Sequence, residues 1–300
     1  MNMKRDFELS RVSPIDEALF TVEPQHELSL GDLLRRQCQL GDAEVARIMA
    51  LQAERGLRFG DAAVALRLVT PDDVARALAR QFSYACTSIE ASPHLAELAA
   101  AVDPHGDKAE VFRDLRTQIM LRPGGTEPAA LAIVSPEAGD GRTHIAANLA
   151  VVFSQMGQRT VLVDANLRTP RLHTLFDLPP SPGLSAILAD RQLAGDLDRV
   201  EALPNLHVLQ VGAPPPNPQE LVQRETFRTL LRELTRKFDR VIVDTPPSQG
   251  TADARVIATA CTQALVIGRR HHSAARHLRA LTDSLRGQRV ELVGVVINEH

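Results

Sequence analysis

The sequence contains no tryptophan, one tyrosine and three cysteines in 300 residues. The cysteines, Cys38, Cys86 and Cys261, are far apart and form no pair with metal-ligand spacing, so we expect reduced thiols in a cytosolic protein. The net charge of −3 gives no support for nucleic-acid binding. No apolar run approaches the ~18–20 residues that span a bilayer, and the N-terminus lacks the apolar core of a signal peptide. Any membrane role would therefore depend on a partner.

Composition and periodicity divide the chain into four parts. The expected parts are a flexible tail (1–25), a small, mainly helical repeat domain (26–88), a linker (89–107) and an α/β domain (108–300). Each copy of the repeat has an apolar residue and glycine at its start, and a glutamine at the same offset further on. The spacing suits two short helices per copy, with Asp42 and Thr70 as N-caps of the second helices.

Beyond residue 108, short apolar runs alternate with helical segments. This order predicts a mostly parallel sheet with helices on both faces, and ligands in such sheets bind at the carboxyl ends of the strands. The expected strands are 131–134, 160–163, 206–211, 240–243, 264–267 and 292–297, and the expected helices lie near 143–157, 218–237, 253–261 and 273–286.

The most informative stretch is the glycine-rich segment 135–144, which follows the first expected strand and opens a helix. Such a loop directs successive backbone N–H groups toward one point at the positive end of a helix dipole, so it predicts a phosphate site. Gly139 and Gly141 can take the backbone angles that the turn needs. Thr143 stands where a P-loop places its magnesium-binding hydroxyl, and Arg142 stands where Walker A loops carry lysine.

Two further strands each end in an aspartate, Asp164 after Val-Leu-Val and Asp244 after Val-Ile-Val. A carboxylate at this edge can hold magnesium, directly or through water, or accept a proton from an attacking hydroxyl. Either residue alone could equally be a helix cap or turn residue. Together with the glycine loop, the two aspartates predict a nucleotide site.

These three motifs resemble the Walker A, A′ and B motifs of bacterial tyrosine kinases (BY-kinases). The A′ segment is Asp164-Ala-Asn-Leu-Arg168, and the Walker B segment is Val243-Asp-Thr-Pro-Pro247. Segment 213–221 resembles the family's Pro-Pro-Asn-Pro-x-Glu-Leu sequence. The closest type is the kinase associated with chain-length determinants in exopolysaccharide operons. The resemblance implies a P-loop NTPase fold of the deviant Walker A, MinD/ParA-like kind.

The resemblance covers about residues 108–298 and implies roles for individual residues. The implied catalytic residues are Asp164, Arg142 and Asp244, and the implied Mg²⁺ residues are Thr143, Asp164 and Asp244. The implied ATP-binding residues are Gly139, Asp140, Gly141, Arg142, Thr143, His144 and Asn298.

Three departures from the family pattern bear on activity. Asn166 stands where many relatives have a second aspartate, which removes one metal-coordinating charge. Arg142 keeps the positive charge of lysine but is planar and longer. With both changes, the resemblance implies ATP binding more firmly than it implies fast phosphoryl transfer. The family's C-terminal tyrosine cluster is absent, so the acceptor would be Tyr84 or a tyrosine of another protein.

Segment 110–116 resembles the family's Glu-x-x-Arg-x-x-Arg helix, which contacts the next subunit. By this resemblance Glu110, Arg113 and Arg116 would form a contact in a homo-oligomer. The alternative is a solvated i, i+3 ion pair on a surface helix.

Three histidines near the C-terminus, His271, His272 and His277, could suggest a metal site. Adjacent histidines point apart on a helix, however, and no acidic residue completes the set. We expect them to form the basic surface start of a helix capped by Ser273.

The N-terminal repeat resembles the MshEN-type domain at the start of type II secretion ATPases, of which some members bind cyclic di-GMP through an arginine and a glycine turn. The second copy keeps this arginine, Arg58, whereas the first copy has Ser29. The implied cyclic di-GMP residues are Arg58, Gly60, Gln81, Gly31 and Gln52. The alternative is a helical docking domain whose leucines and glycines only pack.

Three functions fit these patterns. The first is an ATP-dependent protein-tyrosine kinase that regulates exopolysaccharide synthesis, export and chain length. It would be cytoplasmic and peripheral to the inner membrane, through the cytoplasmic tail of a Wzz-like chain-length determinant. The second is a partition or cell-division ATPase, which is disfavoured because Glu137 occupies the signature-lysine position and no amphipathic membrane helix ends the chain. The third is a non-catalytic nucleotide sensor and scaffold of the polysaccharide machinery.

Overall fold

The computed structural model describes residues 29–71, 73–74, 77–78, 94–104, 106–123, 128–190 and 197–299. The expected tail (1–25), the first part of the expected linker (89–93) and the residues Gln81, Tyr84 and Cys86 lie outside the described residues. None of the described helices is both long and apolar enough to cross a membrane.

The α/β domain is built on one seven-stranded sheet with the strand order β3-β4-β2-β5-β1-β6-β7. Every neighbouring pair is parallel except β3 and β4. The six expected strands are confirmed, whereas the two-residue β3 is too short to produce a pattern in the sequence. The strands are β1 (Ala130–Val134), β2 (Thr160–Asp164), β3 (Asp198–Arg199), β4 (Leu206–Leu209), β5 (Arg240–Asp244), β6 (Thr262–Arg269) and β7 (Glu291–Asn298).

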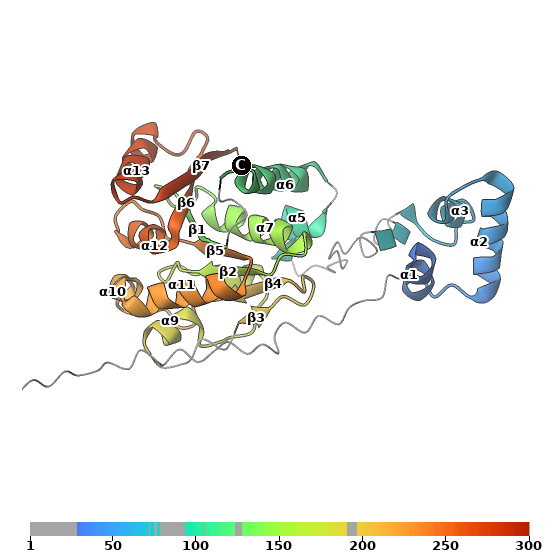
Figure 1. Ribbon diagram of the computed structural model, residues 1–300, viewed down its shortest axis with the longest axis horizontal. Helices are drawn as coiled ribbons and strands as arrows, with labels where there is room; N and C mark the ends of the chain where they lie inside the picture. The colour runs from blue at the N-terminus through green and yellow to red at the C-terminus, as the bar shows by residue number, and fades with distance from the viewer. Residues whose placement is uncertain are drawn as a thin grey trace, which may run out of the picture.

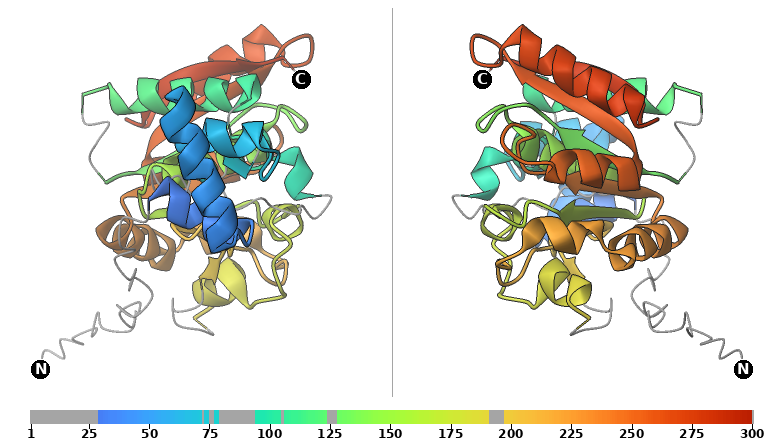
Figure 2. Two further views of the ribbon diagram at one scale, coloured as in Figure 1. Left: turned by 90° about the vertical axis from the view of Figure 1, so that its right-hand side faces the viewer. Right: turned by 90° about the vertical axis from the view of Figure 1, so that its left-hand side faces the viewer.

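Helices cover both faces of this sheet, as predicted (Figures 1 and 2). One face carries α5 (Ala99–Val102), α6 (Asp107–Met120) and α7 (Arg142–Gln155). The other carries α10 (Pro218–Gln223), α11 (Glu225–Lys237), α12 (Asp253–Cys261) and α13 (Ala275–Gly287). Two short helices, α8 (Leu172–Leu175) and α9 (Gly183–Leu188), follow β2.

Each face of the sheet has its own apolar cluster, because alternate residues of a strand point to opposite sides. In β1, Leu131 and Ile133 pack toward α7, whereas Ala132 and Val134 pack toward α12. Helix α7 is buried along nearly its whole length, which explains its almost continuous apolar sequence. A buried α7 fixes the loop that precedes it at the carboxyl edge of the sheet.

The expected linker is partly wrong, because its second half belongs to the packed domain. The short helix η2 (Leu95–Glu97) and α5 precede α6, and Leu98 and Ala100 are fully buried. The backbone N–H of Ala100 donates to Asn148 Oδ1 over 3.0 Å, and Gln155 Nε2 donates to Ala100 O over 2.7 Å. The packed domain therefore begins near residue 95. These helices are too short to show a helical period in the sequence.

The N-terminal domain contains α1 (Leu30–Gln37), α2 (Asp42–Arg55) and α3 (Phe59–Ala65) around a small apolar cluster. The repeat is visible in the caps, because Ser29 and Arg58 are the N-caps of α1 and α3. Thr70 is confirmed as a cap, since its Oγ1 accepts from the N–H of Asp73 over 3.1 Å.

The prediction that Asp42 caps α2 is wrong. Gly41 is the N-cap, and its N–H donates to Glu44 Oε2 over 2.8 Å, so the glutamate closes the cap from within the helix. Gly60 is needed for packing, because a Cβ there would lie 2.7 Å from Val74 Cγ1. The cyclic di-GMP role of this domain stays a prediction.

Candidate active site

The glycine loop between β1 and α7 adopts the predicted conformation. Gly139 has φ 82° and Gly141 has φ 98°, both in the region that only glycine enters without strain. Helix α7 begins directly after Gly141, so the positive end of its dipole faces the loop. A Cβ on Gly141 would lie 2.3 Å from Asn298 Nδ2, which shows how closely the end of β7 approaches the loop.

Arg142 lies beneath the loop and is only 7% exposed. Its Nε donates to Thr245 O over 2.8 Å, and its Nη1 donates to Glu137 O over 2.7 Å and to Ser135 Oγ. The planar guanidinium group of arginine can donate to these separate acceptors at once, whereas the compact ammonium group of lysine cannot. Arg142 therefore ties the glycine loop to the segment after β5. Neither Ser135 nor Thr245 was singled out in the sequence, because the contact with Thr245 spans more than a hundred residues.

Thr143 and Asp244 come together as predicted. The Thr143 Oγ1 donates to Asp244 Oδ2 over 2.6 Å. Asp244 Oδ1 is buried and has no hydrogen-bond partner among the described residues. A buried acceptor without a donor is costly, and a cation would satisfy it. The donor set fits Mg²⁺, which uses one or two carboxylates and a hydroxyl and completes its shell with water and phosphate oxygens.

Asp164 lies directly opposite Asp244 in the parallel register of β2 and β5. Its carboxylate accepts the N–H groups of Asn166, Arg171 and Leu172, each at 3.1 Å. Burial, and then the neighbouring Asp244 carboxylate, raise the pKa of Asp164 to about 7. Burial likewise raises the pKa of Asp244 to about 6. Two buried carboxylates side by side therefore keep a proton to a higher pH than either carboxylate would in water.

Asn166 holds the turn that follows β2. Its Nδ2 donates to Thr169 O over 2.8 Å, and its Oδ1 accepts the N–H of Thr169 over 3.2 Å. An aspartate could not make the first of these bonds. Arg168 in the same turn pairs with the buried Asp253 over 2.7 Å, which joins the turn to the start of α12.

Three other predicted ATP-binding residues, Asp140, Asn298 and His144, lie around the loop, and each side chain contacts a different part of the protein. The Asp140 side chain points toward the segment between β6 and α13. Asn298 Nδ2 donates to Asp140 O over 3.1 Å. The His144 ring packs edge-on against Phe112 of α6 at 5.8 Å, so it joins two helices.

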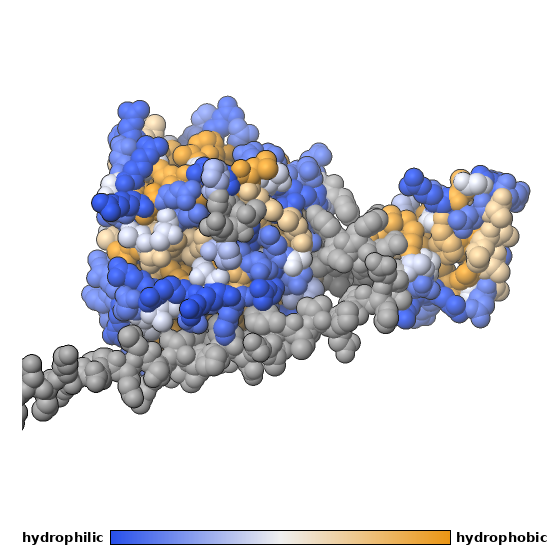
Figure 3. Space-filling view, in the orientation of Figure 1, coloured by the Kyte–Doolittle hydropathy of each residue, from blue (hydrophilic) through white to orange (hydrophobic). Residues whose placement is uncertain are grey.

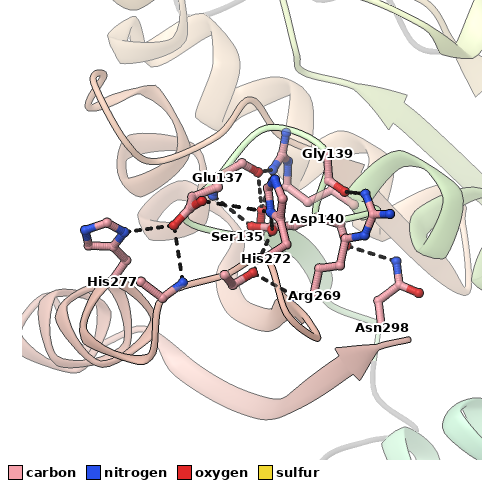
Figure 4. Close-up of polar contacts among 11 residues, drawn as sticks. Ser135, Glu137, Gly139, Asp140, Arg269, His272, His277 and Asn298 are labelled. Carbon is pink, nitrogen blue, oxygen red and sulfur yellow. Dashed lines mark hydrogen bonds and ion pairs between the residues drawn. The ribbon is translucent and has the colours of Figure 1, made fainter. Parts of the chain in front are cut away.

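His271 and His272 are exposed, as expected, but the prediction that Ser273 caps the helix and that no acidic residue lies near the histidines is wrong. Helix α13 begins at Ala275 with Ala274 as its N-cap, and Ser273 Oγ donates instead to Asp140 Oδ1 over 2.6 Å. His272 Nδ1 lies 3.1 Å from the same carboxylate oxygen, and His277 Nδ1 lies 2.8 Å from Glu137 Oε1 (Figure 4). The acidic partners were missed because they lie in the glycine loop, more than 130 residues away.

On α6, Arg113 pairs with Glu110, and Arg116 Nη1 donates to Val152 O of α7 over 2.7 Å. The i, i+3 ion pair of the surface interpretation is therefore present. Apolar surface occurs near α6 and β7 (Figure 3). The exposed apolar residues of these two elements include Val111 and Val295.

The glycine loop between β1 and α7, the buried aspartate at the end of β5 and the parallel strand order define a P-loop NTPase. A family model described as cellulose biosynthesis protein BcsQ matches residues 129–295. The tyrosine-protein kinase YwqD of Bacillus subtilis is 30% identical over 199 residues, which cover 66% of this chain and 84% of YwqD. The chain therefore belongs to the family of bacterial tyrosine-protein kinases, and its α/β domain to the family that the BcsQ model describes.

Solved structures agree with this assignment. The kinase domain of the Escherichia coli tyrosine kinase ETK is 30% identical with a TM-score of 0.64, and the match covers 67% of this chain and 79% of that domain. The septum site-determining protein MinD of Pyrococcus horikoshii, solved with Mg-ADP, is 20% identical with a TM-score of 0.50 over 57% of this chain and 70% of its own. The likeness to MinD shows a shared fold.

Proposed function

We propose that this chain is an ATP-dependent protein-tyrosine kinase that regulates exopolysaccharide synthesis, export and chain length. The observation that carries the proposal is the bond between Thr143 and Asp244 beside Asp164, directly under the glycine loop of a BY-kinase family member. This arrangement supports binding of a nucleoside triphosphate with a divalent cation at the carboxyl edge of the sheet.

Each site residue has a role in the proposed transfer. Thr143 Oγ1 and Asp244 hold Mg²⁺, which neutralises phosphate charge when it is bound. Arg142 donates to phosphate oxygens and stabilises the charge that develops on the transferred group. Asp164 orients the incoming tyrosine hydroxyl and accepts its proton.

The acceptor is a tyrosine outside the described residues. Within the 300 residues Tyr84 is the only tyrosine, so the alternatives are Tyr84 and a tyrosine on another protein. The polysaccharide role is supported by the family model, which is described as a cellulose biosynthesis protein. We propose that the kinase acts in the cytoplasm at the inner membrane, where the tail of a Wzz-like chain-length determinant docks on the nucleotide face.

We also propose that the chain forms a homo-oligomer through α6. The Glu110 side chain is exposed and pairs with the largely buried Arg113, and Val111 beside them is 67% exposed, so this helix offers both charged and apolar contacts. Arg116 would support the helix from beneath through its bond to α7.

The second candidate function is a non-catalytic nucleotide sensor and scaffold, in which the N-terminal domain would bind cyclic di-GMP. It is favoured by the engagement of Arg142 with three protein oxygens, which withdraws part of the guanidinium from phosphate. A partition-type ATPase is disfavoured, because Glu137 at the signature-lysine position is bonded to His277.

The test is phosphotyrosine formation by the purified chain with Mg–ATP, with and without the cytoplasmic tail of the chain-length determinant. We expect phosphotyrosine with the tail present and none after Mg²⁺ is removed with EDTA. Nucleotide binding without any phosphotyrosine would contradict the kinase and favour the sensor.

The stability of the metal-free protein should depend on pH. Since Asp164 and Asp244 have raised pKa values in the folded state, the folded protein binds more protons than the unfolded chain above the ordinary value of 3.8. The free energy of unfolding of the metal-free protein therefore falls as pH rises from about 4 to 7, by at most about 1.4 kcal/mol per pH unit for each extra proton bound. Mg²⁺ bound with ADP would relieve the repulsion between the two carboxylates. We expect the Mg–ADP increase in melting temperature to be larger at pH 8 than at pH 6, and equal increases would contradict this account.

A further inference from the structure

The glycine loop is held from one side by a group of residues that runs from the last residue of β6 to the first turn of α13. We call this group the strap and define it as Arg269, His272, Ser273, Ala274 and His277. Figure 4 shows the side chains of Arg269, His272 and His277 directed toward the loop, together with Asn298 from the end of β7. The bonds join residues about 130 to 160 positions apart in the sequence.

Asp140 is the centre of the strap contacts and is fully buried. Its Oδ2 accepts the N–H of Glu137 over 2.8 Å, and its Oδ1 accepts Ser273 Oγ over 2.6 Å. Burial alone would raise the pKa of Asp140, but the bonds from Ser273 and the Glu137 N–H hold this pKa below its usual value. A buried carboxylate beside a phosphate site repels phosphate, so its contribution is to the shape of the loop.

Glu137 provides a second attachment. Its Oε1 lies 2.8 Å from His277 Nδ1 and accepts the N–H of Ala274 at 3.3 Å. Both acidic residues of the loop thus bind the start of α13. Glu137 accepts the backbone N–H of Ala274, the N-cap, and Asp140 accepts the hydroxyl of Ser273, the residue before the N-cap. The first half of the loop cannot move without moving this helix.

Two side chains hold carbonyl groups in the second half of the loop. Arg269 Nη1 donates to Gly139 O, and Asn298 Nδ2 donates to Asp140 O, both over 3.1 Å. In a trans peptide, the C=O of one residue and the N–H of the next point in opposite directions. Fixing Gly139 O therefore aims the N–H of Asp140 away from β6 and β7, and fixing Asp140 O does the same for Gly141.

These N–H groups are available for a ligand. Those of Asp140 and Gly141 donate to no backbone acceptor among the described residues. Successive N–H groups aimed at one point form an anion site, and an anion site binds tightly only when its donors are already oriented.

We propose that the strap positions the glycine loop for phosphate, with Ser273 and Arg269 as positioning residues that act through Asp140 and Gly139. This inference rests on the proposed nucleotide site but does not depend on phosphoryl transfer. The proposal predicts that the strap sets the affinity for nucleotide phosphates, although Ser273 itself makes no contact with the nucleotide.

The experiment compares the full chain with its Ser273→Ala and Ser273→Thr variants by calorimetric titration with Mg–ADP at pH 8. We expect Ser273→Ala to weaken the affinity at least tenfold, and Ser273→Thr, which keeps the hydroxyl donor, to stay within about threefold of the wild type. Ser284→Ala, the same substitution further along α13, is the matched control and should leave the affinity unchanged.

A second variant, the ³¹P chemical shift and the melting temperature together separate a role in positioning the loop from a role in folding. Arg269→Met removes the carbonyl contact at a different point and should also weaken Mg–ADP at least tenfold. In both weakened variants the ³¹P chemical shift of the bound β-phosphate should move, while the melting temperature without ligand stays within a few degrees of the wild type.

Wild-type affinity and an unchanged ³¹P shift in both Ser273→Ala and Arg269→Met would overturn the proposal. So would a Ser273→Thr variant as weak as Ser273→Ala, or weakened binding that simply follows unfolding in both variants. A wild-type chain that binds no Mg–ADP would overturn it together with the proposed function. A wild-type chain that binds Mg–ADP but forms no phosphotyrosine would overturn the kinase alone.

Discussion

Replacing Asp164 with asparagine should reduce phosphoryl transfer to tyrosine by about 10²–10⁴-fold, the usual contribution of a general base. Asparagine cannot accept the hydroxyl proton, although it can occupy the same space. Mg–ADP binding should persist, because Thr143 and Asp244 are the residues that meet at the cation position. The measurement is initial-rate phosphotyrosine formation alongside titration with Mg–ADP.

The stability of the same variant should not fall with its activity. Asp164 is fully buried and faces Asp244, so a neutral side chain removes a repulsion that exists at pH 8. One amide oxygen can still accept the N–H groups of Arg171 and Leu172, although the bond from Asn166 N is lost. We expect the metal-free melting temperature at pH 8 to be equal to or above that of the wild type.

Asp283→Asn is the matched control, since Asp283 lies on α13 with its side chain 63% exposed and paired only loosely with Arg286 at 3.8 Å. Its transfer rate should equal that of the wild type. An Asp164→Asn variant that transfers phosphate at the wild-type rate would show that Asp164 only supports the turn after β2.

Local sequence patterns predicted most of the fold. Apolar runs of four or five residues marked the central strands, and Gly139 and Gly141 marked the turn before α7, because strand burial and positive φ each demand particular residue types nearby. Asp164 and Asp244 could be paired in advance because parallel strands end at one edge of the sheet.

The rest could not be predicted because it depends on contacts between distant segments. The sequence His-His-Ser before α13 has the composition of an exposed helix start, and only the fold brings Asp140 and Glu137 to it. Similarly, Arg142 has the charge expected of a phosphate ligand, but its burial depends on where the Thr245 carbonyl lies. The Ala-rich helix α5 has no period long enough to distinguish it from a linker.

Replacing Arg142 with alanine should have the largest effect on nucleotide binding. Losing a charge-assisted contact to phosphate costs about 1.5–3 kcal/mol per hydrogen bond, so two such bonds correspond to at least about a 100-fold weaker affinity for Mg–ATP. The fold should suffer as well, because Ser135, Glu137 and Thr245 lose their shared donor. The buried Asp244 also loses the guanidinium charge that lowers its pKa. We expect the free energy of unfolding to fall by about 3–5 kcal/mol, because each buried oxygen left without a donor costs about 1–3 kcal/mol.

Arg142→Lys separates charge from geometry. Lysine keeps the positive charge but is a single donor centre, so it cannot hold the Thr245 carbonyl and the loop oxygens at the same time. We expect Mg–ATP affinity within about tenfold of the wild type, with a free energy of unfolding between those of the wild type and Arg142→Ala. Arg279→Ala, on the exposed side of α13, is the matched control for loss of an arginine and should change neither quantity. If Arg142→Ala binds Mg–ATP as the wild type does but is destabilised, Arg142 is a tether for the loop, and the backbone N–H groups alone hold the phosphates.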